Sequence, residues 1–247
     1  MINIQNLQQY GYMIQYSNVS NWASFITGYQ PITTGNSIQL GQLDWSTYAS
    51  QPSIVISPIT NVSQLYQLIN LQFGYTQETC SSYMSIYSDS TMVLTMDFRG
   101  LGLPTTTYDK FTNLLAIATA GQVSCAKTQG GLCVLPKTCD KYKDLFTYSF
   151  QLQFNATNYM VLPLATFAND RINNANSECV IYVEWLDETQ ADSNQVVVGQ
   201  MFFQSIAVMQ EMGHNVTHNL TMAVNINALN GTYIGNQTVE SCDPAAF

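Results

Sequence analysis

The chain has 247 residues, of which 46% are hydrophobic and only 9% are charged. This is enough apolar material for a buried core, and it leaves a surface of hydroxyl, amide and tyrosine side chains. Sixteen acidic and seven basic residues give a net charge of -9, and Lys and Arg occur only from Arg99 to Arg171. Binding to nucleic acid or to anionic lipid headgroups needs clustered basic residues, so the composition argues against both kinds of partner.

The predicted elements are mostly short strands. In chain order, a weak helical pattern covers residues 4–12, and apolar and polar residues alternate in 37–40, 53–56, 68–73 and 148–154. Apolar, β-branched runs follow at 179–185 and 195–198. The clearest helix, at 105–120, comes directly after Pro104. Residues 121–143 are predicted as a surface loop held by cysteines, and 169–176 as a polar turn. Many short strands and few helices predict an all-β fold with a few short helices.

Two features predict a secreted or cell-surface glycoprotein: six cysteines, an even number, and seven Asn-x-Ser/Thr sequons. The sequons begin at Asn18, Asn61, Asn155, Asn215, Asn219, Asn230 and Asn236. The first residues lack the basic and apolar regions of a signal peptide, so we expect the chain to be part of a longer precursor. No apolar run reaches the roughly 18 residues of a membrane-spanning helix, and no membrane span is predicted.

Five landmarks occur in one order along the chain. They are Ile38–Asp44 (IQLGQLD), Leu65–Leu68 (LYQL), Met92–Pro104 (MVLTMDFRGLGLP) before the helix, the pair Cys139 and Cys179, and Val196–Phe203 (VVVGQMFF). This series resembles the second, C-terminal lobe of pepsin-like aspartic peptidases. In that family the third landmark is three apolar residues, Asp-Thr/Ser-Gly-Thr/Ser, a few small or apolar residues, Pro and a helix.

The resemblance implies a pepsin-like acid-protease lobe over residues 38–211. Residues 1–37 would be the end of the first lobe or an inter-lobe segment, and 212–247 a glycosylated C-terminal extension. It also implies a disulfide between Cys139 and Cys179, and an N-terminal lobe present as a separate or cleaved chain.

The active-site motif is degenerate. In the ungapped alignment Thr95 stands at the aspartate position, Met96 at the Thr/Ser position and Asp97 at the glycine position. A hydroxyl cannot replace one of the two carboxylates that share a proton in these enzymes. Shifting the frame makes Asp97 the carboxylate but places Phe98 and Arg99 in the loop, and Arg99 would hold Asp97 as an anion. Either frame predicts an inactive lobe, so no catalytic residue is assigned.

Other chemistry has weaker support. His214 and His218 have the spacing of metal ligands on a helix, but the residues around them alternate as in a strand. The cysteines have no Cys-x-x-Cys pair for zinc, and no nucleophile has a partner for a catalytic triad. No metal and no cofactor are therefore predicted. Local Cys125–Cys133 and long-range Cys80–Cys242 bridges would complete the disulfide set.

Together these features predict a catalytically inactive, aspartic-peptidase-like secreted glycoprotein. Its expected role is structural or protein-binding, in an extracellular or cell-surface assembly with other glycoprotein subunits. The alternative is one lobe of a two-chain aspartic endopeptidase that hydrolyses peptide bonds at acid pH, with Asp97 as its carboxylate. A third possibility, an inhibitor or lectin-like module, is not separated from the structural role by the sequence.

Overall fold

The fold is mostly β-sheet, as predicted. The computed structural model describes residues 12–14, 49–59, 65–76, 81–95, 98–127, 131–173, 176–187, 194–210, 219–226 and 228–235. Within these ranges the strands form three sheets, and α2 (Thr105–Ala118) is the one α-helix. Short 3₁₀ turns, η3 (Cys139–Lys141), η4 (Leu145–Thr147), η5 (Leu164–Phe167) and η6 (Gln200–Gln204), connect several strands.

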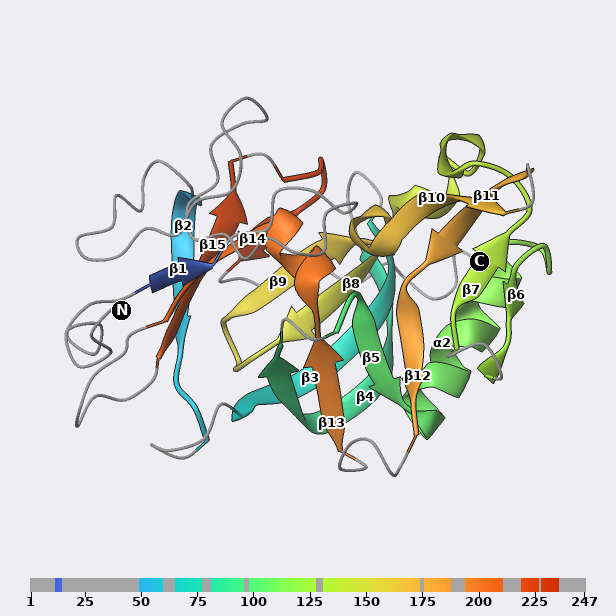
Figure 1. Ribbon diagram of the computed structural model, residues 1–247. Helices are drawn as coiled ribbons and strands as arrows, with labels where there is room; N and C mark the ends of the chain where they lie inside the picture. The colour runs from blue at the N-terminus through green and yellow to red at the C-terminus, as the bar shows by residue number, and fades with distance from the viewer. Residues whose placement is uncertain are drawn as a thin grey trace, which may run out of the picture.

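The largest sheet has eight strands and forms the centre of the molecule (Figure 1). Its order is β12 (Val183–Leu186), β5 (Leu101–Pro104), β13 (Gln195–Val198), β4 (Ser81–Leu94), β3 (Leu65–Thr76), β8 (Tyr148–Gln153), β9 (Tyr159–Pro163) and β16 (Tyr233–Gly235). The longest two, β3 and β4, pair antiparallel along most of their length.

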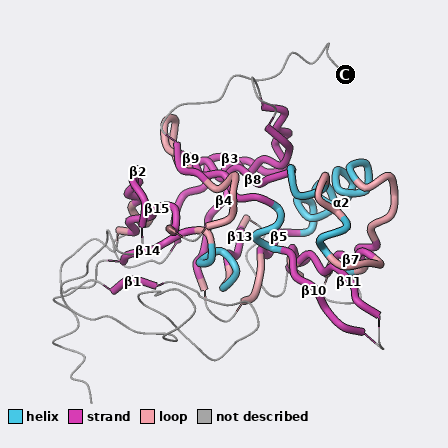
Figure 2. Tube along the Cα trace, turned by 90° about the horizontal axis from the view of Figure 1, so that it is seen from above, coloured by secondary structure: helices cyan, strands magenta, loops and turns pink. Residues whose placement is uncertain are grey.

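Two four-stranded sheets lie at opposite ends of the central sheet (Figure 2). One has the order β1 (Tyr12–Ile14), β14 (Ile206–Gln210), β15 (Leu220–Asn225) and β2 (Ala49–Ile56). The other has the order β10 (Ala168–Asn173), β11 (Asn176–Ile181), β7 (Cys133–Leu135) and β6 (Ser124–Cys125). Strands from all three predicted segments, 1–37, 38–211 and 212–247, share these sheets.

The helix α2 begins at the predicted position and packs on the central sheet. Pro104 precedes its first turn, where a missing backbone N–H costs nothing. The Phe111 side chain is fully buried, and its ring lies 5.1 Å from that of Phe73 on β3 and 5.3 Å from that of Phe150 on β8. Such aromatic pairs contribute about 1 kcal/mol each beyond the area they bury. The alternating apolar residues of β3 and β8 therefore form the core beneath the helix.

Several strands match the prediction, and two loop predictions are wrong. The segments 53–56, 68–73, 148–154 and 195–198 lie in or overlap β2, β3, β8 and β13, and 179–185 spans parts of β11 and β12. Residues 121–143, predicted as a surface loop, contain β6 and β7, and Leu135 of β7 is fully buried. Residues 169–173 and 176, predicted as a turn, belong to the β10–β11 hairpin. Both were missed because β7 and β11, which are distant in sequence, pair with each other, and a local pattern does not show this pairing.

The remaining predicted elements fall largely outside the described residues. These are the strand at 37–40 and the helix at 4–12, of which only Tyr12 is described and begins β1.

Candidate functional site

A strand from late in the chain is inserted between two strands that are consecutive in sequence. β13 pairs parallel with β4 and antiparallel with β5, so it separates them in the sheet. The segment 95–100, which connects β4 to β5, must therefore pass across the end of β13. This crossing brings the described residues Thr95 and Phe98–Gly100 next to the Gly199 turn that follows β13.

Four backbone hydrogen bonds join segment 95–100 to the end of β13. They run from Thr95 N–H to Val198 O (3.0 Å), Gly199 N–H to Gly100 O (2.7 Å), Gln200 N–H to Phe98 O (2.8 Å) and Met201 N–H to Arg99 O (2.8 Å). Each bond gives a partner to backbone groups that would otherwise lack one, so the two segments fix each other's position.

Gly199 allows this close approach, and Gly100 allows a second one, between the crossing segment and Tyr182. A Cβ on Gly199 would lie 2.3 Å from the carbonyl oxygen of Phe98, and one on Gly100 would lie 1.7 Å from that of Tyr182. No real Cβ approaches a backbone oxygen so closely. Only residues without a side chain fit these positions, which explains why glycine stands on both sides of the crossing.

The described part of the crossing segment offers a hydroxyl, an aromatic ring and a cation. Thr95 is partly buried at the end of β4, and Phe98, Arg99 and Gly100 follow. Met96 and Asp97 lie outside the described residues. The position that the ungapped alignment equates with the catalytic aspartate is thus Thr95, whose N–H is bonded to β13.

A carboxyl group that the sequence analysis missed lies near the crossing segment. The Arg99 guanidinium carbon is 3.7 Å from the centre of the Tyr182 ring, a cation–π contact. Burial raises the pKa of Glu184 on β12 to about 7, and the charge of Arg99 acts against that rise. A carboxyl with this pKa exchanges its proton near neutral pH. The available signal was a single Glu between Val183 and Trp185 in an apolar strand.

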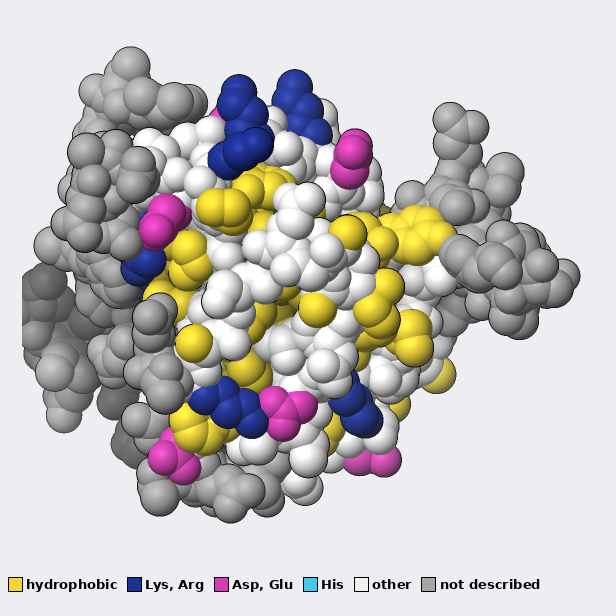
Figure 3. Space-filling model, turned by 90° about the vertical axis from the view of Figure 1, so that its right-hand side faces the viewer, with side chains coloured by type: hydrophobic (Ala, Val, Ile, Leu, Met, Phe, Trp, Pro, Cys, Tyr) yellow, Lys and Arg dark blue, Asp and Glu magenta, His cyan; other side chains and the backbone are white. Residues whose placement is uncertain are grey.

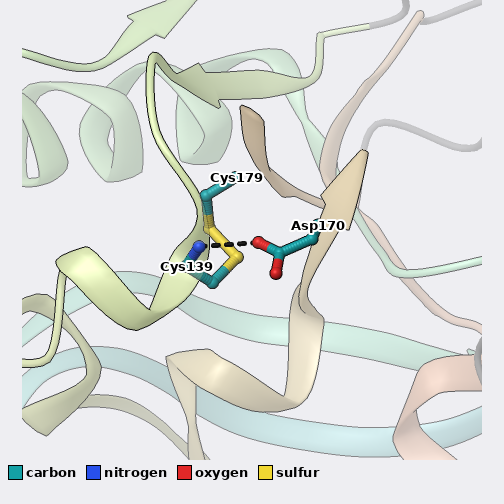
Figure 4. Close-up of side chains that lie close together, drawn as sticks. All are labelled: Cys139, Asp170 and Cys179. Carbon is teal, nitrogen blue, oxygen red and sulfur yellow. Dashed lines mark hydrogen bonds between the residues drawn. A yellow bond between two sulfur atoms is a disulfide. The ribbon is translucent and has the colours of Figure 1, made fainter. Parts of the chain in front are cut away.

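The second four-stranded sheet is held by two disulfides, Cys125–Cys133 and Cys139–Cys179. Both are pairings expected from the sequence; Cys80 and Cys242 lie outside the described residues. Figure 4 shows Asp170 of β10 beside Cys139 and Cys179, and its carboxylate accepts a hydrogen bond from the Cys139 N–H at 2.6 Å. These three residues have the composition of a metal site. Because both sulfurs are in the disulfide, neither is a thiolate ligand here.

The face that carries α2 and the disulfide-linked sheet presents basic and acidic side chains close together, with apolar surface between them (Figure 3). Two of its ion pairs are Lys127 with Asp109 and Lys141 with Asp140, each at 2.7 Å. Exposed pairs of this kind stabilise little.

The other predicted sites are only partly described. Of the sequons, Asn155 and Asn230 lie in exposed turns, and Asn219 directly precedes β15. The remaining sequons and both histidines, Asn18, Asn61, Asn215, Asn236, His214 and His218, lie outside the described residues.

In comparison with known proteins, no family model and no curated protein matches the chain. In the described part of the chain, no helix has both the length and the hydrophobicity to cross a membrane.

Proposed function

We propose that the chain is a catalytically inactive, pepsin-like lobe of a secreted glycoprotein, with a structural or protein-binding role outside the cell. The observation that carries the proposal is the crossing of segment 95–100 over β13. Two landmarks of the resemblance, Met92–Pro104 and Val196–Phe203, contribute residues to this crossing, and their sequences support the resemblance. The crossing is closed by backbone bonds and by Gly199, while Thr95 stands where the resemblance requires a carboxylate.

Inactivity follows from the chemistry of the segment. Two carboxylates must approach closely enough to share a proton for one to activate water and the other to protonate the leaving group. A threonine hydroxyl at position 95 supplies neither a base nor an acid of suitable pKa. Arg99 brings a positive charge into the same segment, which would keep Asp97 ionised.

The role outside the cell is supported by the surface and the disulfides. Two disulfides within one small sheet are typical of proteins that fold in an oxidising compartment. A surface with few charges can pack against other subunits with little desolvation of ions. Folded proteins with few accessible Lys and Arg residues also offer few cleavage sites to trypsin-like peptidases.

The test is a cleavage assay on the assembled protein, purified without reductant from its native source. Quenched-fluorescent peptides are incubated with it at pH 3 to 6, with and without a pepstatin-like inhibitor. The Asp97→Asn variant, made by altering the gene in the same source, is assayed in parallel. We expect no inhibitor-sensitive cleavage and no difference between the variant and the unsubstituted protein. Inhibitor-sensitive cleavage that Asp97→Asn abolishes would refute inactivity and establish the two-chain endopeptidase.

The binding role is tested on the same material by identifying every polypeptide that remains with the chain through size-exclusion chromatography. We expect a companion lobe or other glycoprotein subunits at a constant ratio to this chain. Elution as a single polypeptide without companions would contradict the structural role.

A further inference from the structure

Three of the seven sequons lie among the described residues, and their surroundings differ. Asn155 and Asn230 are exposed, whereas Asn219 is only partly exposed. An N-linked glycan is large and hydrophilic, so a folded protein accommodates it only where the asparagine amide faces solvent. The three surroundings therefore predict different occupancies.

Asn155 lies at the tip of the β8–β9 hairpin, in a turn closed by a hydrogen bond from Phe154 N–H to Asn158 O (2.9 Å). Its Oδ1 accepts hydrogen bonds from the N–H of Thr157 (2.9 Å), from the Thr157 hydroxyl (3.0 Å) and from Asn158 N–H (2.7 Å). With the oxygen turned toward these donors, the amide nitrogen points the other way on an exposed turn. The sequon hydroxyl already contacts the carboxamide of the asparagine.

Asn230 lies in a turn closed by a hydrogen bond from Thr232 N–H to Leu229 O (3.1 Å). Gly231 has a φ of +89°, as the third position of a type II turn requires. The turn is bordered by exposed apolar side chains: Leu229 is 45% exposed and Ile226 is 51% exposed. A glycan here would project from the turn and cover apolar surface that otherwise contacts water.

Asn219 is in a different situation. It directly precedes β15, which lies between β14 and β2, and the next residue, Leu220, is 2% exposed. The Asn219 Oδ1 atom is buried and has no hydrogen-bond partner among the described residues. Asn219 is thus only partly exposed at the end of an interior strand, so a glycan there would have less free solvent around it than one at Asn155 or Asn230.

We propose that the folded protein carries N-linked glycans at Asn155 and Asn230 but not at Asn219, and that the glycan at Asn230 covers Ile226 and Leu229. In the transfer step, the asparagine Nδ2 bonds to the anomeric carbon of a lipid-diphosphate-linked oligosaccharide. The bond from sugar to phosphate breaks, the lipid diphosphate leaves, and the amide loses one proton. The inference rests on the proposed function only in requiring passage through the secretory pathway.

The test is site occupancy in the full chain, secreted from a eukaryotic host by an added signal sequence. Release of glycans by a peptide amidase in ¹⁸O-water converts each glycosylated asparagine to ¹⁸O-labelled aspartate, which peptide mass spectrometry locates. We expect label at Asn155 and Asn230 and none at Asn219. Label at Asn219, or its absence from either of the other two, would overturn the assignment.

Substitutions separate occupancy from the covering role. Asn155→Gln and Asn230→Gln should each remove one glycan mass from the secreted protein, and Asn219→Gln should remove none. Thr232→Val is the matched variant for Asn230, because it removes the sequon hydroxyl, a buried group with no hydrogen-bond partner in the described structure. Both changes at the Asn230 sequon should raise binding of an apolar fluorescent dye about twofold.

Asn155→Gln should leave dye binding unchanged. Unchanged dye binding in both Asn230→Gln and Thr232→Val would refute the covering role. The cleavage assay on the same samples reports separately on the proposed function, since neither turn belongs to the crossing segment.

Discussion

Replacing Glu184 with Gln tests whether this carboxyl is as buried as the structure indicates. Burial raises the pKa of Glu184 from 4.5 to about 7, so the folded protein binds this proton more tightly than the unfolded chain does. Its protonation therefore favours folding. That contribution is complete below about pH 4.5 and is lost as the pH rises through 7.

The magnitude follows from the same pKa. Each unit of difference between the folded and unfolded pKa corresponds to about 1.4 kcal/mol, so full burial would cost about 3.4 kcal/mol at pH 8. The side chain is only partly buried, and solvent screening lowers the expected cost to about 2 kcal/mol. Glu184→Gln removes the charge and keeps the shape. Part of that cost is already present at pH 5, so we expect the substitution to raise the free energy of unfolding by about 1.5 kcal/mol more at pH 8 than at pH 5.

The assay is urea unfolding of both proteins at pH 5, 6, 7 and 8, followed by tryptophan fluorescence. Taking the difference between the variant and the unsubstituted chain at each pH cancels the titration of all other groups. Glu178→Gln is the matched control, because the Glu178 carboxylate lies 3.0 Å from the guanidinium of Arg171. Losing that partner should weaken the protein at pH 8, the opposite sign. A Glu184→Gln effect that does not change between pH 5 and 8 would refute the reasoning.

Three further predictions concern stability. Gly199→Ala should destabilise the fold by about 3 kcal/mol in urea unfolding, because its Cβ meets the Phe98 carbonyl at 2.3 Å. Replacing Cys139 and Cys179 together by Ser should cost about 4 kcal/mol, since the bridge closes a loop with a sequence separation of 40. Phe111→Ala should cost about 4 kcal/mol, since it empties a fully buried site between two aromatic rings.

Each of these has a control within the chain. A Cβ at Gly121 would meet no atom within 4 Å, and only the φ of +76° is unfavourable for alanine. Gly121→Ala should therefore lower the free energy of unfolding by about 1 kcal/mol. Removing the Cys125–Cys133 bridge, with a sequence separation of 8, should cost about 3 kcal/mol. Ile117→Ala on α2 removes a side chain that is 78% exposed and should have almost no effect. Equal costs within any pair would contradict the corresponding explanation.

Local features of the protein follow from its amino-acid sequence alone. Alternation predicted β2, β3 and β8 because a strand with one buried face needs a period of two, and an apolar, β-branched run predicted β13. Pro104 and the apolar spacing after it predicted α2. Composition argued against nucleic-acid and anionic-lipid partners, and the resemblance of the landmarks to a known family implied the disulfide between Cys139 and Cys179, which the structure contains.

Some segments are strands only because they pair with other strands in the tertiary structure, and their local pattern does not predict this. β4 is rich in serine and lacks an apolar alternation along most of its length, yet it is the longest strand, because β3 pairs with it and β13 flanks it. The β10–β11 hairpin is polar, and its sequence predicts a turn. It forms two strands in the structure, where β7 pairs with β11 and the Asp170 carboxylate accepts a hydrogen bond from the Cys139 N–H. β13 and β7 lie far from these segments in sequence, so a local pattern does not contain them.

The residues of the candidate site also fall into two groups, those identified from the sequence and those identified only from the structure. Thr95, Met96 and Asp97 were identified from the sequence because the motif is contiguous. Glu184 was not, because its pKa depends on burial beside β5 and on the charge of Arg99, which is far away in sequence. Whether a sequon faces solvent or a packed sheet is likewise a property of the fold. The tripeptide supplies the chemistry, and the neighbouring strands determine whether its amide is accessible.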